Sequence, residues 1–241
     1  HLSVSGGRPA VYGHAARREG RHLRLKAARR LYHAVLEADP DRVEVHNTLG
    51  YMALEEGRYE EAVASFKRYV YFAGDSANPH DSLGEAFLRT GRYHESIEEY
   101  RRALEIDPSF LSSVLGATES LRITGQFALA RKFLESFGEL FERRDQLAAR
   151  EVQYLQIDYQ AEAWTKVVSR VEKLRADEEA FAEFEPGLRL LVNTLGAIGM
   201  SELGRATEAE ELIEEAETSF QYFLARIDPE QLQVRESLQL L

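Results

Sequence analysis

Hydrophobic positions recur along the chain at helical spacing, and one arrangement of them occurs twice. The stretch NTLGYMALEEGRYEEAVASF, residues 47–66, is followed by DSLGEAFLRTGRYHESIEEY, residues 81–100, which begins thirty-four positions later. In each copy, apolar residues at helical spacing flank a Gly-Arg-Tyr triplet. The first copy predicts two antiparallel helices, about 44–56 and 59–72, joined at Gly57, where a left-handed backbone ends a helix at little steric cost.

Small residues occupy the positions where the two helices of a copy would cross. Gly50 and Ala62 of the first copy become Gly84 and Ser96 in the second. Small side chains let the two backbones approach closely, while leucines and an aromatic residue fill the flanks. Two helices of this size cannot bury their apolar faces alone, so a period of thirty-four residues predicts stacked pairs that share a core.

This period and residue pattern resemble the tetratricopeptide repeat (TPR), and the style of the copies is similar to that of bacterial TPR proteins. The resemblance is strong over residues 43–144, with clear copies at 43–76, 77–110 and 111–144. Thr118 replaces the crossing glycine in the third copy, which predicts a wider crossing there. The resemblance implies an all-α fold, a right-handed superhelical solenoid of antiparallel helix pairs, with five or six pairs and a cap.

The rest of the chain divides according to how well it keeps the period. We expect a TPR array over 24–144, in which a helix at about 24–38 is the second helix of an earlier repeat. Residues 1–23 form a basic N-terminal segment or a partial first repeat helix. Residues 145–241 keep the pattern less well and predict degenerate TPR-like pairs, interrupted by an acidic connector that ends at Pro186. A C-terminal capping helix after Pro229 would hide the last core face.

Charge and composition mainly exclude classes of protein. The net charge is −11, yet residues 1–30 hold eight basic residues and one acid, so the remainder carries −18. The acidic body argues against nucleic-acid binding, because affinity for phosphates needs clustered cations. For the basic end, packing against an acidic neighbour is favoured over an anion-binding tail. No apolar run of about 18 residues occurs, so no membrane span is expected. The absence of cysteine excludes disulfides and thiolate chemistry.

No set of catalytic residues accompanies the helices. The sequence has no phosphate loop, dinucleotide fingerprint, hydrolase elbow or EF-hand loop, so we expect neither an enzyme nor a cofactor or metal. His46 and His80 lie one repeat apart. We interpret them as packing residues between helices rather than as a metal or pH-sensitive pair, since no third ligand has matching spacing.

The TPR resemblance also implies where a partner binds. In TPR arrays the first helices line a concave surface that commonly grips an extended or helical peptide. The candidate residues are those on the first helices that face away from the packing stripe. In chain order they are Asn47, Tyr51, Asn78, Asp81, Glu85, Arg89, Glu119 and Arg122.

The chemistry of these positions favours one kind of partner. Some TPR proteins hold a chaperone's C-terminal carboxylate with a Lys-Asn-Arg clamp, which is not reproduced here. Asp81, Glu85 and Glu119 would repel a carboxylate. A protein or peptide partner that carries Lys or Arg, with an apolar anchor near Tyr51, fits better.

Three functions stay open on the sequence alone. We favour a noncatalytic protein–protein interaction scaffold that binds its partner in the concave groove. The alternative is a regulatory TPR segment of a larger multidomain enzyme, which the start at His1 without a methionine motivates; a metal protein that uses the histidines is the third. A cytoplasmic location is favoured, with a processed periplasmic protein left open, and the oligomeric state is undetermined.

Overall fold

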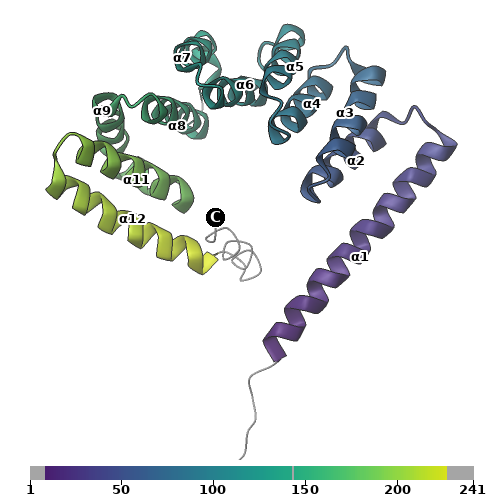
Figure 1. Cartoon of the computed structure of the whole chain (residues 1–241), viewed down its shortest axis with the longest axis horizontal. Helices are drawn as coiled ribbons and strands as arrows, with labels where there is room; N and C mark the ends of the chain where they lie inside the picture. The colour runs from purple at the N-terminus through teal and green to yellow at the C-terminus, as the bar shows by residue number, and fades with distance from the viewer. Residues whose placement is uncertain (1–8, 143, 227–241) are drawn as a thin grey trace, which may run out of the picture. The chain divides into compact units, whose positions relative to one another are not determined.

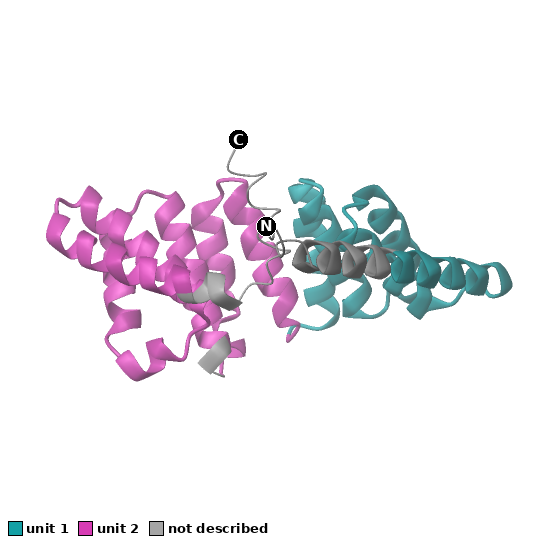
Figure 2. Cartoon of the chain, turned by 90° about the horizontal axis from the view of Figure 1, so that it is seen from below, with its two compact units in different colours: residues 1–108 teal, residues 109–241 magenta. Residues whose placement is uncertain are grey.

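A computed structural model describes residues 9–142 and 144–226, and every regular element in these two ranges is a helix (Figure 1). They contain twelve α-helices and one short 3₁₀ helix, and consecutive helices pack against one another as pairs. The predicted all-α fold of TPR-like helix pairs is therefore confirmed. The chain forms two compact units, residues 1–108 and 109–241, which we describe separately (Figure 2).

Unit 1 consists of one long helix followed by two helix pairs. Within it α2 packs on α3, α4 packs on α5, and α4 also packs across α3 and α2. The helix expected at about 24–38 begins earlier, because α1 is helical from Pro9. The helices are α1 (Pro9–Ala38), α2 (Val43–Glu55), α3 (Tyr59–Ala73), α4 (Ala77–Arg89) and α5 (Tyr93–Ile106).

The predicted glycine crossings are present in both pairs of unit 1. A Cβ atom built on Gly50 would lie 2.5 Å from the ring of Phe66, and one built on Gly84 would lie 2.9 Å from the ring of Tyr100. Both rings are buried. The hydroxyl of Ser96 donates to the carbonyl oxygen of Gly84 at 2.8 Å, so this small residue also ties the two helices together. The role assigned to these small residues is confirmed.

His46 and His80, which lie one repeat apart, form hydrogen bonds to the loops before α2 and α4. His46 and His80 are buried, and their Nε2 atoms lie 2.8 Å from the carbonyl oxygen of Pro40 and 3.1 Å from that of Gly74. A carbonyl oxygen only accepts, so Nε2 donates in both cases. The Nδ1 atom of His80 also lies 2.6 Å from Glu99 Oε2. Both histidines are thus buried between helices, as predicted for packing residues, while the carboxylate of Glu99 beside His80 was not predicted.

Unit 2 keeps the paired arrangement, with α-helices that range from 5 to 21 residues. Gly196 and Gly199 let α11 approach α9 closely, since added Cβ atoms would lie 2.8 Å from Val171 and 3.0 Å from Val167. The acidic connector contains a short helix, and Pro186 opens the helix after it, as predicted. The elements are α6 (Leu111–Ile123), α7 (Phe127–Ser136), the 3₁₀ helix η1 (Gly138–Leu140), α8 (Arg144–Gln160), α9 (Trp164–Arg175), α10 (Glu178–Ala182), α11 (Pro186–Glu202) and α12 (Ala206–Arg226).

Some sequence predictions fall on residues that the structure does not describe. The capping helix expected after Pro229 and the first eight residues of the basic segment are among them. Thr118 is buried and its hydroxyl donates to the carbonyl oxygen of Val114 in the same helix at 2.7 Å, while the wider crossing stays a prediction. Among the described helices, none combines the length and the apolar character that crossing a membrane requires.

Candidate functional site

An aromatic side chain links the first helices of the two pairs in unit 1. The hydroxyl of Tyr51 on α2 shares a hydrogen bond of 3.0 Å with the hydroxyl of Ser82 on α4. The Tyr51 ring also meets the ring of Phe66 edge-on, with 5.0 Å between centroids. Tyr51 still exposes 36% of its surface. A large ring is thus held in one orientation while one side of it stays accessible.

The surroundings of Tyr51 are acidic. Burial raises the pKa of the Tyr51 phenol, and the nearby carboxylates of Glu85 and Asp81 raise that pKa further, while the hydrogen bond with Ser82 opposes the shift. Glu85 is half-buried and pairs with the exposed Arg89 at 3.2 Å. Asp81 is buried, with 9% of its surface exposed. Two carboxylates therefore act on the phenol, and Glu85 is the more accessible of the two.

Two asparagines border the same surface. The amide nitrogen of Asn78 on α4 donates to the hydroxyl of Tyr69 on α3 at 2.9 Å. The amide oxygen of Asn47 on α2 is buried, and no donor from the described part of the chain reaches it. We call the set around Tyr51 the Tyr51 surface. It comprises Asn47, Tyr51, Tyr69, Asn78, Asp81, Ser82, Glu85 and Arg89.

The remaining two predicted residues belong to unit 2. Glu119 and Arg122 lie on α6, where Arg122 Nη2 is 3.7 Å from Glu119 Oε1. Arg122 exposes only 12% of its side chain, and this burial lowers the pKa of its guanidinium, with Glu119 opposing the shift. The structure thus brings six of the eight predicted residues together on unit 1 and places two on another unit. Sequence reasoning overlooked Ser82 and Tyr69, whose hydroxyls hold Tyr51 and Asn78.

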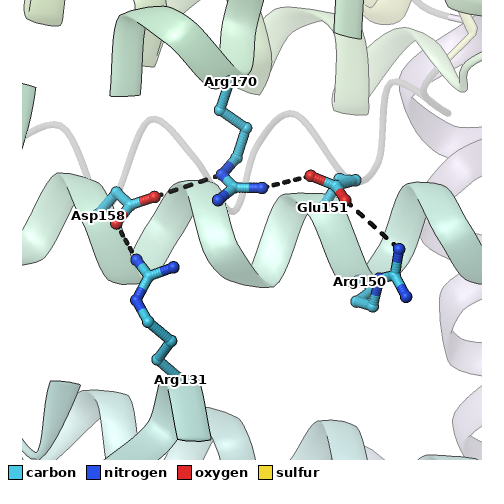
Figure 3. A network of polar contacts seen from close by, with 5 residues as sticks. All are labelled: Arg131, Arg150, Glu151, Asp158 and Arg170. Carbon is cyan, nitrogen blue, oxygen red and sulfur yellow. Dashed lines mark hydrogen bonds and ion pairs between the residues drawn. The ribbon is translucent and has the colours of Figure 1, made fainter. Parts of the chain in front are cut away.

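A network of charges in unit 2 was not predicted (Figure 3). Asp158 on α8 is almost fully buried and accepts hydrogen bonds from Arg131 of α7 and, at 3.3 Å, from Arg170 of α9. Glu151, two turns earlier on α8, pairs with Arg170 and, at 3.6 Å, with Arg150. Because the charges pair with one another across three helices, we assign this network to holding the helices together. The signal for this network in the sequence is the pair of acidic residues Glu151 and Asp158, which lie seven positions apart on one face of a helix.

A smaller network joins the last helices of unit 2. Both terminal nitrogens of Arg175 on α9 lie 2.7 Å from the carboxylate of Glu215 on α12. Arg175 also donates to the side-chain oxygen of Asn193 on α11 at 2.6 Å. The Arg175 guanidinium lowers the pKa of the Glu215 carboxyl. Across the part of the chain that the structure describes, no group of three or more His, Asp or Glu side chains is arranged to hold a metal ion.

Comparison with known proteins agrees with the helix-pair architecture. Two family models, each described as a tetratricopeptide repeat, match residues 15–79 and 77–110. No curated protein sequence matches the chain.

Solved structures of TPR proteins have the same fold. PilW, described as a widely conserved type IV pilus biogenesis factor, is 18% identical over 90% of this chain and 96% of its own, with a TM-score of 0.68. A tetratricopeptide repeat protein from Parabacteroides merdae ATCC 43184 is 13% identical over 92% of this chain and 80% of its own, with a TM-score of 0.62. YrrB, described as a TPR protein with an unusual peptide-binding site, is 13% identical over 78% of this chain and 91% of its own, with a TM-score of 0.55. At these identities the likeness concerns the fold alone.

Proposed function

The chain belongs to the tetratricopeptide repeat family, and from this premise we propose that it is a noncatalytic scaffold that binds a protein or peptide partner on the Tyr51 surface. TPR domains generally mediate protein or peptide binding and are typically noncatalytic, and the family comparison detects no catalytic domain in this chain. Fold membership alone does not locate a site, so the argument for this surface comes from its residues.

The observation that carries the proposal is the fixed and accessible ring of Tyr51. Its hydrogen bond to Ser82 and its edge contact with Phe66 restrict the side chain before any partner arrives. A partner that packs against a preorganised aromatic side chain loses less conformational entropy on binding. Tyrosine is also enriched among the residues that dominate binding energy at interfaces. An apolar side chain of the partner therefore fits against this ring.

The charges around the ring favour a basic residue beside that apolar group. Glu85 and Asp81 both act on the Tyr51 phenol, so a cation placed there is attracted by two carboxylates. Arg89 competes for Glu85 in the free protein, yet this pair is partly exposed to solvent, and ion pairs at the surface contribute only about 0–1 kcal/mol. A partner's Lys or Arg displaces Arg89 at small energetic cost. Glu119 and Arg122 on α6 belong to unit 2, and a contribution of these two residues to partner binding stays a separate prediction.

A peptide-display selection against the full chain tests the proposal. We expect enrichment of peptides with Lys or Arg next to an apolar side chain. Their binding, measured by fluorescence anisotropy, weakens at least about tenfold on Tyr51→Ala or Glu85→Arg, which corresponds to about 1.4 kcal/mol. Glu105→Arg on α5 makes the same charge change at another exposed position and serves as the matched control. Selected peptides that bind Tyr51→Ala as tightly as the parent would refute the assignment.

A further inference from the structure

A buried carboxylate in the second helix pair of unit 1 is held by a histidine and an arginine. The Nδ1 atom of His80 on α4 lies 2.6 Å from Glu99 Oε2 on α5. The other oxygen of this carboxylate, Oε1, accepts a hydrogen bond from Arg102 Nη1 at 2.7 Å. Glu99 exposes only 7% of its surface. Because a charged group loses its hydration on burial, it needs partners of this kind.

The first helix pair keeps the histidine and the arginine but replaces the glutamate by a serine. One period of thirty-four residues earlier, the histidine recurs as His46 and the arginine as Arg68, whereas Ser65 stands at the position of the glutamate. The Nε2 atom of His46 donates to the carbonyl oxygen of Pro40, as its counterpart does in the second pair. Among the residues that the structure describes, neither the Nδ1 atom of His46 nor the guanidinium of Arg68 has a hydrogen-bond or ion-pair partner. The two groups that hold a carboxylate in the second pair are therefore both available in the first.

A pocket of about 400 Å³ lies at the position of this replacement. His46, Ser65 and Arg68 all line it, and its walls come from α1, α2 and α3. His46 exposes only 2% of its surface, so the pocket reaches a side chain that is otherwise buried. The apolar part of the wall is formed by Leu36, Leu49 and Ala64. The pocket thus combines two groups that can hold a carboxylate with a surface that suits an aliphatic chain.

The other charged side chains at the pocket restrict the kind of ligand. Glu37 on α1 and Glu61 on α3 line the pocket and are exposed to solvent, and so is His33. Glu61 already pairs with Arg58. Water and salt screen the charges of these exposed acids, yet both acids disfavour a second negative charge on the ligand. A ligand with a single carboxylate therefore fits this pocket better than a dicarboxylate.

We propose that this pocket binds a carboxylate on a short aliphatic chain, with the carboxylate in the place that the Glu99 side chain provides in the second pair. One carboxylate oxygen faces Nδ1 of His46, the other accepts from the guanidinium of Arg68, and the aliphatic chain packs against the apolar wall. Since Nε2 of His46 already carries the proton donated to Pro40, the bond at Nδ1 needs one further proton. The ligand brings this proton as the acid or takes it up from solution.

Histidine ring signals in NMR spectra of the full chain test the proposal. Propionate has the atoms of a glutamate side chain beyond Cα, and we expect it to shift the His46 signals in a saturable way. His80, whose Nδ1 already faces Glu99, is the internal control and is expected to stay unchanged. Propionamide has the same shape without the charge and is expected to bind at least about tenfold more weakly, as is propionate to Arg68→Gln. If propionamide shifts the His46 signals as strongly as propionate does, the assignment to a carboxylate is wrong.

A variant that supplies the carboxylate from the chain itself tests the geometry. Ser65→Glu is expected to melt roughly 2–4 °C higher than Ser65→Gln, the control of equal size without charge, if its carboxylate gains about 1 kcal/mol from the two partners. Arg68→Gln is expected to reduce this difference. Ser65→Glu is also expected to abolish the response of His46 to propionate. A Ser65→Glu chain that melts no higher than Ser65→Gln, or that still binds propionate, would overturn the proposal.

A comparison of two probes identifies the source of the carboxylate. The α-amide of N-acetylglutamate carries the same carboxylate on a peptide backbone. Tighter binding of this probe than of propionate assigns the site to a glutamate of a protein partner, and weaker binding assigns it to a small acid. The absence of a saturable response to either probe contradicts the proposal. The pocket shares no residue with the Tyr51 surface, so Ser65→Glu is expected to leave the binding of peptides selected on that surface unchanged.

Discussion

The helices α2 and α3 approach closely at Gly50, and this contact decides whether Gly50→Ala stabilises or destabilises the protein. A Cβ atom at this position would lie 2.5, 2.6 and 2.8 Å from three carbons of the Phe66 ring, whereas ordinary carbon contacts are about 3.5–4.0 Å. Phe66 is fully buried, so its ring has no solvent side into which it can move. Gly50→Ala therefore requires that α2 and α3 separate or that the core rearranges.

Two opposing effects set the magnitude. In a helix interior alanine is favoured over glycine by about 1 kcal/mol. Overpacking a close-packed core costs about 1–3 kcal/mol. We expect Gly50→Ala to lower the free energy of unfolding by about 0–2 kcal/mol although it improves helix propensity. Phe66→Leu removes the ring that the new methyl group would meet, so in that background the same change is expected to stabilise by up to about 1 kcal/mol.

Urea unfolding of the four proteins in this double-mutant cycle, followed by circular dichroism, measures both effects. The coupling between the two substitutions is expected to be about 1–3 kcal/mol, as for residues in direct contact. If Gly50→Ala changes the free energy of unfolding equally in both backgrounds, the close-packing argument for the repeat's glycines is wrong.

Three further predictions concern the charges and the phenol. Asp158→Asn is expected to destabilise unit 2 by about 2 kcal/mol in thermal or urea unfolding, because the partly buried guanidinium groups of Arg131 and Arg170 lose the negative charge and one of the two oxygens with which they pair. Glu215→Gln is expected to destabilise by less than about 1 kcal/mol at neutral pH, since Glu215 is half-exposed. Arg175 lowers the pKa of Glu215 in the folded state. The difference in unfolding free energy between the parent protein and Glu215→Gln is therefore present above the ordinary pKa of a glutamate, and it disappears as the pH falls through the lower pKa of the folded state. Ultraviolet titration against Tyr51→Phe is expected to show that Tyr51 ionises above the usual pKa of about 10, and that Glu85→Gln moves its pKa down.

The helix-pair architecture was predictable because steric limits at the turns and helix crossings require glycine at fixed positions of the first two copies. Gly57 has a φ of +70°, as a tight turn between two helices requires, and Gly91 in the next copy has +74°. The contacts of Gly50 and Gly84 with aromatic rings recur at one period. Each of these features depends on residues within about twenty positions, so a single sequence displays them.

The candidate site was predictable only in part. The sequence identified the helix faces, but it did not distinguish the accessible Tyr51 from the buried Asp81 on the same predicted surface. That distinction depends on how α4 packs against α2 and α3, which no local pattern encodes. The partners of Asp158 were missed for a similar reason, since Arg131 is 27 positions away along the chain.

By itself, the sequence determined that this protein is a series of helix pairs, where each pair turns, and which small residues lie at the crossings. These choices follow from helical periodicity and from the steric limits on a backbone turn. Tertiary structure alone decided which polar side chains of the first helices stay accessible and which charges are buried together. Burial of a side chain is set by the neighbouring pair that packs on it, and that neighbour is a property of the folded chain rather than of the local pattern.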